Sequence, residues 1–427
     1  MIHPIEPFEA LKLLKNHWKT PEKIKYIQNQ KLRKLVKHSY EKVPYYRKLF
    51  DSLKLKPEDI QSADDLKKLP LLSKKIIKSL SFEQFIAKGI DIKKCRTAIT
   101  SGSTGTPLRV YYSWQDARMI GITLVRNFLT FGVRPWYKIA VFSGFTDLPP
   151  ERRIFDRVGM WRCWKISSHE EPGYWTDKLL KWDPQVIYSN FMTIKLLAEF
   201  VLEKGLRNIK PKIVISTAGV LDESSRQKIS LAFGSKIFDY YASWEGGNIA
   251  WECPECSGYH INSDMVILEV LKDGHHLSSK KEGEVVITNL HSYAMPFIRY
   301  RQEDIVAPSE EKPICGRPFP LIKKIQGRLL DFIVLPSGKK LCPHPFLKVM
   351  SNLQGIKHWR IIQEDSNLLS VKIAPCKGYK ELLSDTIRKQ LFKLVGSTLK
   401  INISFIEEIK FDPSEKIRQI ISRVIES

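Results

Sequence analysis

Short apolar runs recur through the middle of the chain, and each is flanked by turn residues. Runs such as Ile-Ala-Val-Phe, Val-Ile-Tyr and Ile-Val-Ile lie at 138–143, 186–188 and 212–216, and a further run lies at 236–240. Continuous apolar runs of this length are typical of strands that are buried on both faces. Because helical patterns separate the runs, this part of the chain is predicted to form an α/β sheet.

The flanking parts of the chain have different patterns. The first 95 residues are predicted to be helical, with breaks at Pro44, Pro57 and Pro70. Polar and apolar residues alternate between 265 and 335, which predicts a sheet or barrel, and 336–427 mixes strands with a helix. The fold class expected is therefore α/β. A large multi-sheet N-terminal domain would include a small β-barrel-like subdomain, and a small α+β domain would follow it.

One polar segment interrupts these patterns at residues 100–107, which read Thr-Ser-Gly-Ser-Thr-Gly-Thr-Pro. The segment is poorly suited to a core, because a buried hydroxyl costs free energy unless it is hydrogen-bonded. It suits a phosphate, because hydroxyls and backbone N–H groups donate to phosphate oxygens and glycine lets the backbone approach an anion. It is not a Walker A loop, since Gly105 is followed by Thr106 instead of Lys. These residues alone leave a phosphate loop and a polar surface turn both open.

Charged residues stand at three later places where the strand pattern predicts loops. Glu245 lies at a turn with two glycines, where a carboxylate suits a divalent cation held by phosphates. Asp304 ends the segment 300–304, and a carboxylate can accept hydrogen bonds from the two vicinal hydroxyls of a ribose. Arg328 is a candidate donor to phosphate or ribose, and Asp331 lies at the boundary of the last domain. Each is a weak signal alone, since turn glutamates are mostly solvent-exposed and Asp often caps a helix.

In their order and spacing these motifs resemble the adenylate-forming superfamily of acyl-CoA ligases, peptide-synthetase adenylation domains and luciferases. Residues 100–107 resemble its phosphate loop. Tyr-Ala-Ser-Trp-Glu at 241–245 resembles its Tyr-Gly-x-Thr/Ser-Glu motif, and Tyr-Arg-Gln-Glu-Asp at 300–304 resembles its Tyr-Arg-Thr-Gly-Asp motif. Gly-Arg at 327–328, with Asp331, resembles its hinge motif. These motifs, found in the same order and at similar spacing, make the resemblance far more specific than any one of them.

Three further segments are similar to one branch of this superfamily, the phenylacetate–CoA ligases and CapK-like proteins. These segments are 260–264, 294–301 and 315–317, and the whole resemblance covers about residues 30–427. It implies an enzyme that uses ATP and Mg²⁺ to activate a small carboxylic acid as its adenylate. The acyl group would then pass to coenzyme A, or to an amine or a sugar. CapK-like relatives often occur with polysaccharide genes, so the resemblance extends to capsular polysaccharide biosynthesis.

The resemblance also implies which residues bind the nucleotide. Hydroxyls of the polar octapeptide would hold the β- and γ-phosphates, while Ala218 and Gly219 would pack on adenine. Asp304 would accept from the ribose hydroxyls, with Arg328 beside it. The complete set is Thr100, Ser101, Gly102, Ser103, Thr104, Gly105, Ala218, Gly219, Tyr241, Asp304 and Arg328.

The catalytic groups implied by the resemblance are Glu245, as the Mg²⁺ ligand, and Lys416. An ammonium that bridges the carboxylate and the α-phosphate would stabilise the charge of the transition state. Lys416 would be carried by a small mobile domain, 332–427, which rotates about Asp331 against a large nucleotide-binding domain, 1–330.

Four residues depart from the superfamily pattern, and they indicate a diverged member. Ala242 and Glu303 replace the usual glycines of two motifs, and Glu415 replaces the glycine before the lysine. Trp244 stands where a small hydroxyl residue is usual, beside the expected acid pocket. It would narrow this pocket or stack on an aromatic or sugar-like acid. These departures leave open a protein that binds ATP without turnover.

The cysteines predict a second, structural site. Cys253 and Cys256 have the Cys-x-x-Cys spacing that lets two thiolates bind one Zn²⁺, and His260 follows closely. Cys315 is the favoured fourth ligand, with His291 and Cys342 as alternatives. Reduced thiols without metal and a redox-active pair are the competing interpretations.

The net charge of +23 adds a question about partners. It suits nucleic acid, an anionic membrane or glycan, or simply a lysine-rich surface. A basic zinc-knuckle protein that binds nucleic acid would not explain the octapeptide or Asp304, so no nucleic acid is expected. Residues 12–48 form the densest basic segment, with apolar residues such as Leu11, Trp18 and Leu35 at helical spacing, and peripheral membrane contact stays open. Without a signal-like start or a long apolar run, a cytoplasmic location is expected; a homodimer is left open.

Overall fold

The computed structural model describes most of the chain. The described residues are 6–99, 108–143, 158–168, 170–255, 258–272, 275–276, 282–309, 311–328, 332–338, 340–341, 345–346, 349–350, 353–376, 380–396, 399–409 and 419–424. The octapeptide 100–107 with its six predicted phosphate-loop residues, and also Cys256, Asp331, Cys342 and Lys416, lie outside them.

The N-terminal part is helical, as predicted, and its longest helix begins at a proline. Helices α1 (Glu6–Leu14), α2 (Pro21–Lys42), α3 (Pro44–Ser52) and α4 (Lys74–Ser79) are joined by short 3-10 turns. Thr20 caps α2 by accepting a hydrogen bond from the backbone N–H of Lys23. Leu35 is fully buried in α2, whereas Leu11 and Trp18 are 51% and 76% exposed, so the predicted apolar face is wrong for these two residues. None of the described helices is long and apolar enough to cross a bilayer.

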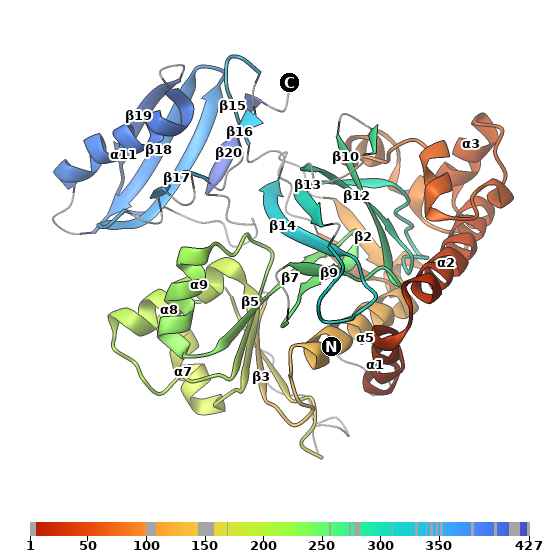
Figure 1. The fold of residues 1–427 in the computed structure, drawn as a ribbon, viewed down its shortest axis with the longest axis horizontal. Coiled ribbons are helices and arrows are strands. Elements are labelled where there is room, and N and C mark those ends of the chain that lie inside the picture. Colours follow the sequence, from red (N-terminus) through yellow and green to blue (C-terminus); the bar gives the residue numbers. More distant parts are fainter. Residues whose placement is uncertain are drawn as a thin grey trace.

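A twelve-stranded sheet forms the centre of the molecule (Figure 1). Five of its strands are parallel: β3 (Ile139–Phe142), β4 (Cys163–Ile166), β5 (Val186–Asn190), β6 (Ile213–Thr217) and β7 (Lys236–Ser243). Four of them match the predicted apolar runs, whereas β4 was not predicted. Strands β3, β5 and β6 are buried on both faces, which is why their sequences contain continuous apolar runs.

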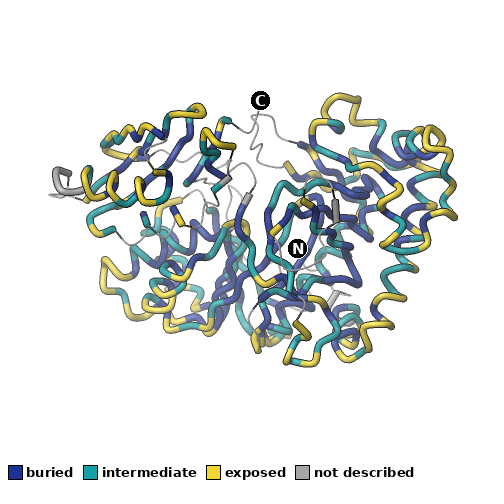
Figure 2. Tube along the Cα trace, turned by 45° about the horizontal axis from the view of Figure 1, so that its top comes forward, coloured by how far each residue is buried: buried dark blue, intermediate teal, exposed yellow. Residues whose placement is uncertain are grey.

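Helices cover the two faces of this parallel region. Helices α7 (Pro172–Trp182), α8 (Phe191–Glu203) and α9 (Glu223–Phe233) pack on one face (Figure 1). On the other face, α5 (Trp114–Thr130) packs together with α1, and Arg118 of α5 forms an ion pair with Glu9 of α1 at 2.6 Å. Figure 2 shows that the buried residues follow the strands, while exposed residues lie on the outer surfaces of the helices.

The same sheet continues as antiparallel strands beyond β7. These strands are β8 (Gly247–Glu252), β9 (Tyr259–Ile261), β10 (Val266–Lys272), β11 (His275–His276), β12 (Gly283–Asn289), β13 (Tyr300–Ser309) and β14 (Leu321–Arg328). The predicted strand-rich region is thus confirmed, and its strands are hydrogen-bonded to the parallel region through β7 and β8. Separately, β1 (Arg96–Ile99) and β2 (Arg109–Tyr112) pair antiparallel on either side of the octapeptide.

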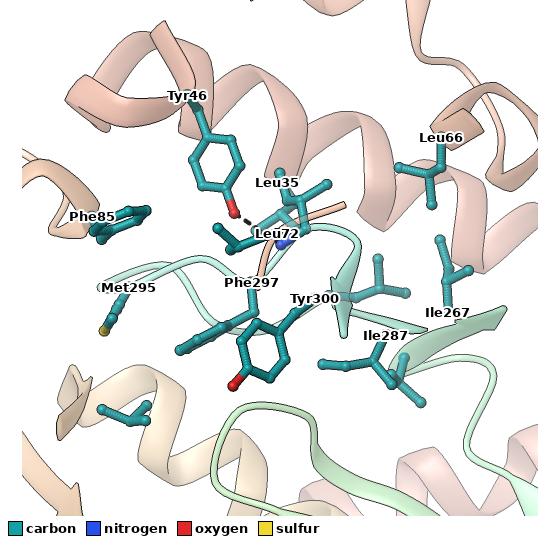
Figure 3. Packing of buried hydrophobic residues seen from close by; sticks show 14 of the residues in the cluster. Leu35, Tyr46, Leu66, Leu72, Phe85, Ile267, Ile287, Met295, Phe297 and Tyr300 are labelled. Carbon is teal, nitrogen blue, oxygen red and sulfur yellow. Dashed lines mark hydrogen bonds between the residues drawn. The ribbon is translucent and has the colours of Figure 1, made fainter. Parts of the chain in front are cut away.

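The N-terminal helices pack on the antiparallel strands and fix the position of β13. Leu35, Leu66 and Phe85 lie in one hydrophobic cluster with Phe297 and Tyr300 (Figure 3). The buried Tyr46 hydroxyl donates to the carbonyl of Pro296 at 3.0 Å and accepts from the N–H of Ile298 at 2.9 Å. The start of β13 is therefore held both by packing and by hydrogen bonds.

A small α+β unit ends the chain, as predicted. Its four-stranded sheet contains β17 (Ile356–Asp365), β18 (Leu368–Pro375), β19 (Lys400–Phe405) and β20 (Ile420–Ser422), with α11 (Lys380–Val395) and a short hairpin of β15 (Ile333–Val334) and β16 (Lys340–Leu341). Among the residues that the structure describes, its hydrophobic cluster contains only ones between 333 and 420. The predicted fold class, a large α/β part with a small α+β part, is confirmed.

Candidate active site

The turn between β7 and β8 holds Glu245 in a largely buried position. Its side chain is 7% exposed, and the hydroxyl of Tyr300 donates to Oε1 at 3.1 Å. The side chain of Asn289 donates to the Glu245 carbonyl at 3.0 Å. The turn needs glycine at Gly247, because its φ is +66°. Glu245 is thus a fixed carboxylate at the carboxyl end of β7, a position where α/β sheets commonly bind ligands.

The hairpin that carries the octapeptide is attached to this turn. The hydroxyl of Tyr112, at the end of β2, donates to the backbone carbonyl of Trp244. This bond ties the β1–β2 hairpin to the turn that bears Glu245 at the Arg96–Tyr112 end of the hairpin, whereas residues 100–107, outside the described part, connect its other end. Trp244 itself is 52% exposed.

A second pair of predicted residues meets at β13. The hydroxyl of Tyr241 in β7 donates to Oδ2 of Asp304 at 2.6 Å. Asp304 is also the register partner of Arg328 in the antiparallel pair of β13 and β14. Glu303 stands where the superfamily motif has glycine. Its φ of +60° keeps the left-handed backbone that glycine favours. Tyr241 and Asp304 are therefore in direct contact, and the backbone of Arg328 lies opposite that of Asp304.

The predicted adenine segment lies at the carboxyl end of β6, next to β7. Gly219 has no room for a side chain, because a Cβ there would lie 2.8 Å from Cβ of Phe191. Ala218 adopts a positive φ of +60°. The chain thus makes a tight turn beside the end of β7, which carries Tyr241. This arrangement places Gly219 and Tyr241 at one edge of the sheet.

Beside Glu245 the described residues enclose a pocket that the sequence did not predict. It lies between α5, the start of β8 and the segment after β12, and its lining includes Asp116, Met119, Ile120, Asn248, Met265 and His291. Trp244, predicted to border the acid, is not among the lining residues. The sequence holds little sign of it: Asp116 is the N3 residue of a capping box that starts at Ser113, and His291 is predicted only as an alternative metal ligand.

A buried ionic network supports the back of this pocket. Arg126 Nη1 donates to Asp264 Oδ2 at 2.6 Å, and Nη2 donates to Oδ1 at 3.1 Å. Asn16, from the N-terminal segment, donates to Asp264 Oδ2 at 2.7 Å. Burial by itself raises the pKa of Asp264, but attraction by Arg126 and by Lys31 outweighs it and holds this pKa below its usual range. Asp264 therefore stays ionised in the core.

Three of the predicted metal ligands lie together at the other end of β8. One ligand atom each of Cys253, His260 and Cys315 lies within 4.8 Å of the others. His260 Nδ1 lies 3.0 Å from the carbonyl of Phe319, and Nε2 lies 3.3 Å from Cys315 Sγ. Burial lowers the pKa of His260 to about 4, which keeps its imidazole neutral.

The structure distinguishes between the candidates for the fourth zinc ligand. His291 lines the pocket next to Lys31, and it is not part of the described cysteine–histidine cluster. Cys315 lies in that cluster. Cys256 and Cys342 lie outside the described residues.

The chain is similar to several known proteins. Residues 333–423 match the family model of the CapK C-terminal domain. The chain is 26% identical to phenylacetate-coenzyme A ligase of Thermus thermophilus, over 90% of this chain and 92% of that protein. It is 22% identical to protein CapK of Staphylococcus aureus, over 93% and 89% of the two chains.

A solved structure of 2-hydroxyisobutyryl-CoA ligase, in the postadenylation state in complex with R3-HIB-AMP, has the same fold. It superimposes with a TM-score of 0.78 over 96% of this chain and 91% of that chain, at 17% identity. The resemblance derived from the motifs is thereby confirmed. The chain is a homologue of the phenylacetate-coenzyme A ligases and of CapK, with the fold of the adenylate-forming acyl-CoA ligases.

Proposed function

We propose that this protein is an ATP-dependent ligase that activates a carboxylic acid as its acyl-adenylate and transfers the acyl group to coenzyme A. Its homology to phenylacetate-coenzyme A ligases and its acyl-CoA ligase fold support both steps. The observation that carries the proposal is that two hydrogen bonds, from Tyr300 to Glu245 and from Tyr241 to Asp304, join β13 to β7 and the turn after it. The hairpin that bears the octapeptide is bound to the same turn.

The proposed reaction consists of two displacement steps. A carboxylate oxygen attacks the α-phosphorus of ATP, the new O–P bond forms, and the bond to the β-phosphate breaks to release pyrophosphate. The sulfur of coenzyme A, having lost its proton, then attacks the acyl carbon and releases AMP. Neither displacement needs a nucleophile from the protein, so positioning and electrostatics supply the catalysis.

Particular residues of the chain fit these tasks. Asp304, oriented by the Tyr241 hydroxyl, presents a carboxylate to vicinal hydroxyls such as those of ribose. Glu245 offers oxygen ligands of the kind that Mg²⁺ prefers, and a bound Mg²⁺ would neutralise the departing pyrophosphate. Lys416, assigned by resemblance, would place an ammonium between the carboxylate and the α-phosphate.

Movement of the C-terminal part is the second half of this proposal. We assign domains to 1–330 and 332–427 with a hinge near Asp331, because the hydrophobic cluster of the last part contains its own residues alone. Lys416 would enter the site by that rotation. A role in capsular polysaccharide synthesis has support only from the similarity to CapK.

The test is ATP–pyrophosphate exchange with a panel of carboxylic acids. We expect acid-dependent exchange, and a roughly 100- to 1000-fold loss in Lys416→Ala, since one preorganised charge-stabilising group is removed. Ser103→Ala should also lower exchange. Lys393→Ala, at an exposed lysine in the last turn of α11, is the matched control and should leave exchange unchanged.

The possible results separate the competing interpretations. Nucleotide binding without exchange would support the degenerate ligase-like protein suggested by Glu303 and Glu415, and would refute the proposed activity. Failure to bind ATP would reopen the nucleic-acid interpretation of the basic chain. Exchange that survives in Lys416→Ala would show that the lysine is wrongly assigned.

We also propose that Cys253, His260 and Cys315, with Cys256, bind a structural Zn²⁺. Two or three thiolates and an imidazole are a donor set that suits zinc. A histidine ligand usually donates its second ring N–H to a carbonyl, and Nδ1 of His260 lies at hydrogen-bond distance from the carbonyl of Phe319. The site would join the end of β8, strand β9 and the segment before β14.

Metal analysis tests this site directly. Protein purified without chelator is expected to carry about one zinc per chain, as one tetrahedral site requires. Cys315→Ser should lower both the zinc content and the melting temperature, because a thiolate ligand is lost. Cys163→Ser, at a half-buried cysteine outside the cluster, is the control. Full zinc content in Cys315→Ser, or none in the wild type, would refute the site.

A further inference from the structure

The amino ends of the parallel strands carry a row of basic residues. Lys138 and Lys212 directly precede β3 and β6, and Lys236 begins β7. The backbone N–H of Gln185 donates to the carbonyl of Lys138 at 2.9 Å, and that of Lys212 donates to the carbonyl of Gln185 at 2.8 Å. The N–H of Lys236 donates to the carbonyl of Lys212 at 3.2 Å. Since neighbouring strands lie about 4.8 Å apart, the backbones of the three lysines lie in one row roughly 14 Å long.

Three helices end beside this row. Helices α7, α8 and α9 each run back along the sheet, and two to nine residues join each of them to the next parallel strand. Lys138 Nζ donates to the carbonyl of Trp182, the last residue of α7, at 2.5 Å. The carboxyl ends of these helices and the amino ends of β5, β6 and β7 therefore form one end of the α/β region (Figure 1). We call this region the basic end, and it consists of residues 131–138, 180–185, 202–212 and 231–236.

Large apolar side chains are exposed at the basic end. Leu180, Leu202 and Leu231 each lie in the last turn of their helix, and they are 45%, 44% and 75% exposed. Trp136, two residues before Lys138, is 61% exposed. Single exposed apolar residues are common on protein surfaces. Here four of them, from four separate connections, lie at the end that also carries the lysine row.

The positive charge of the basic end is mostly unpaired. Its four segments contain eight lysines and arginines, but only two acids. Within the described part of the chain, one ion pair involves these segments, and it joins Lys138 to Asp183 at 3.8 Å. Arg207, Lys210 and Lys212 follow one another closely in the connection between α8 and β6, and all three are exposed. The basic end therefore attracts anions.

An anionic lipid bilayer is the partner that suits both properties. Lysine and arginine are attracted to anionic headgroups, while leucine and tryptophan stabilise contact at the boundary between headgroups and acyl chains. The phosphate backbone of a nucleic acid would pair with the cations, but it offers the exposed leucines no comparable contact. Glu245 and Gly219 follow the carboxyl ends of β7 and β6, at the opposite end of the strands. Docking at the basic end would thus leave the candidate active site uncovered.

We propose that the basic end docks the protein peripherally on an anionic lipid bilayer. The connection between α8 and β6 supplies the charge, and Trp136 and Leu231 enter the headgroup region. This inference goes beyond the proposed adenylation and does not depend on it. It also differs from a membrane contact through the basic segment 12–48, which carries the exposed Trp18. The two contacts can therefore be told apart by their tryptophans.

The first test is co-sedimentation of the full chain with lipid vesicles. Binding to phosphatidylcholine vesicles that contain phosphatidylglycerol should be roughly tenfold or more stronger than to phosphatidylcholine alone, and it should weaken as salt is added. Lys210→Glu combined with Lys212→Glu should weaken it roughly tenfold or more, because two attractive charges become repulsive. Lys12→Glu combined with Lys34→Glu is the matched control. It makes the same change in net charge at exposed lysines of α1 and α2, and it should have a much smaller effect.

The second test is quenching of tryptophan fluorescence by brominated acyl chains in the same anionic vesicles. Trp136→Phe should remove most of the quenching. Trp18→Phe, at a tryptophan that is 76% exposed in the segment 12–48, is the matched control and should leave the quenching in place. Leu231→Ser keeps the charge but should weaken vesicle binding several-fold, because apolar contact area is lost. Since all the substituted side chains are exposed, the melting temperatures should stay close to that of the wild type.

Several results would overturn the inference. One is wild-type protein that does not bind the anionic vesicles, and this holds also where the protein binds DNA, which would assign the cations to nucleic acid. Another is an equal loss in the two charge variants, because net charge and not the basic end would then decide binding. A third is quenching that persists in Trp136→Phe and is lost in Trp18→Phe. Vesicle binding is measured without ATP or acid, so failure of docking and failure of the proposed adenylation are distinguished.

Discussion

Glu245→Gln is expected to lower ATP–pyrophosphate exchange roughly 100- to 1000-fold, because a metal ligand that stabilises transition-state charge contributes several kcal/mol. Glutamine has nearly the same shape as glutamate, and its amide oxygen can still accept the hydrogen bond from the Tyr300 hydroxyl. The substitution therefore removes the negative charge with little change in packing. Exchange rates measured over a range of Mg²⁺ concentrations should show a raised Mg²⁺ requirement as well as the lower maximal rate.

Tyr300→Phe provides the matched control for this prediction. It removes the hydrogen bond at 3.1 Å but leaves the charge of Glu245 in place. A neutral hydrogen bond contributes about 1 kcal/mol, so the expected loss is only about tenfold or less. If Glu245→Gln keeps most of the wild-type exchange, or if Tyr300→Phe loses as much, then the role of Glu245 as the metal ligand is wrong.

Arg126→Met is expected to destabilise the folded protein by about 3–5 kcal/mol, because it leaves the carboxylate of Asp264 buried without its main counter-charge. Both side chains of this ion pair are 0% exposed, and two guanidinium nitrogens contact the two carboxylate oxygens. Urea unfolding followed by tryptophan fluorescence measures the change in the free energy of unfolding.

Two comparisons test the electrostatic origin of that loss. Arg47→Ala breaks the solvent-exposed pair of Arg47 and Asp51, and it should cost no more than about 1 kcal/mol. Arg126→Met combined with Asp264→Leu removes both charges and should recover much of the loss. Equal losses in the single and double variants would mean that packing, and not the unpaired charge, governs the stability of this region.

The same ion pair predicts how stability depends on pH. The pKa of Asp264 is lower in the folded protein than in the unfolded chain, where it is about 3.9. The pair therefore stabilises the wild type fully above about pH 4, and this contribution is lost as the pH falls further and Asp264 becomes protonated. The difference in the free energy of unfolding between the wild type and Arg126→Met should therefore become smaller below about pH 4.

Local signals explain what the sequence revealed. The buried strands β3, β5 and β6 were visible because both of their faces are covered, which requires continuously apolar runs. The candidate site residues were visible as motifs at turns, and the structure brings Tyr241, Asp304 and Glu245 to one edge of the sheet. The exposed positions of Leu11 and Trp18 were not visible, because helical periodicity identifies a face but not whether another element covers it.

The sequence by itself determined the α/β architecture, the order of the motifs and the resemblance to adenylate-forming ligases, because these depend on periodicity and on residues close together in the chain. Only the tertiary structure decided which charges are buried and which residues line the pocket. Arg126 and Asp264 are 138 positions apart, and Lys31 and Asp264 are 233 positions apart, so neither partner can be recognised from its own neighbourhood. Lys31 resembles the many surface lysines of a basic chain, and it acquires its role only when α2 packs behind Met265 and His291.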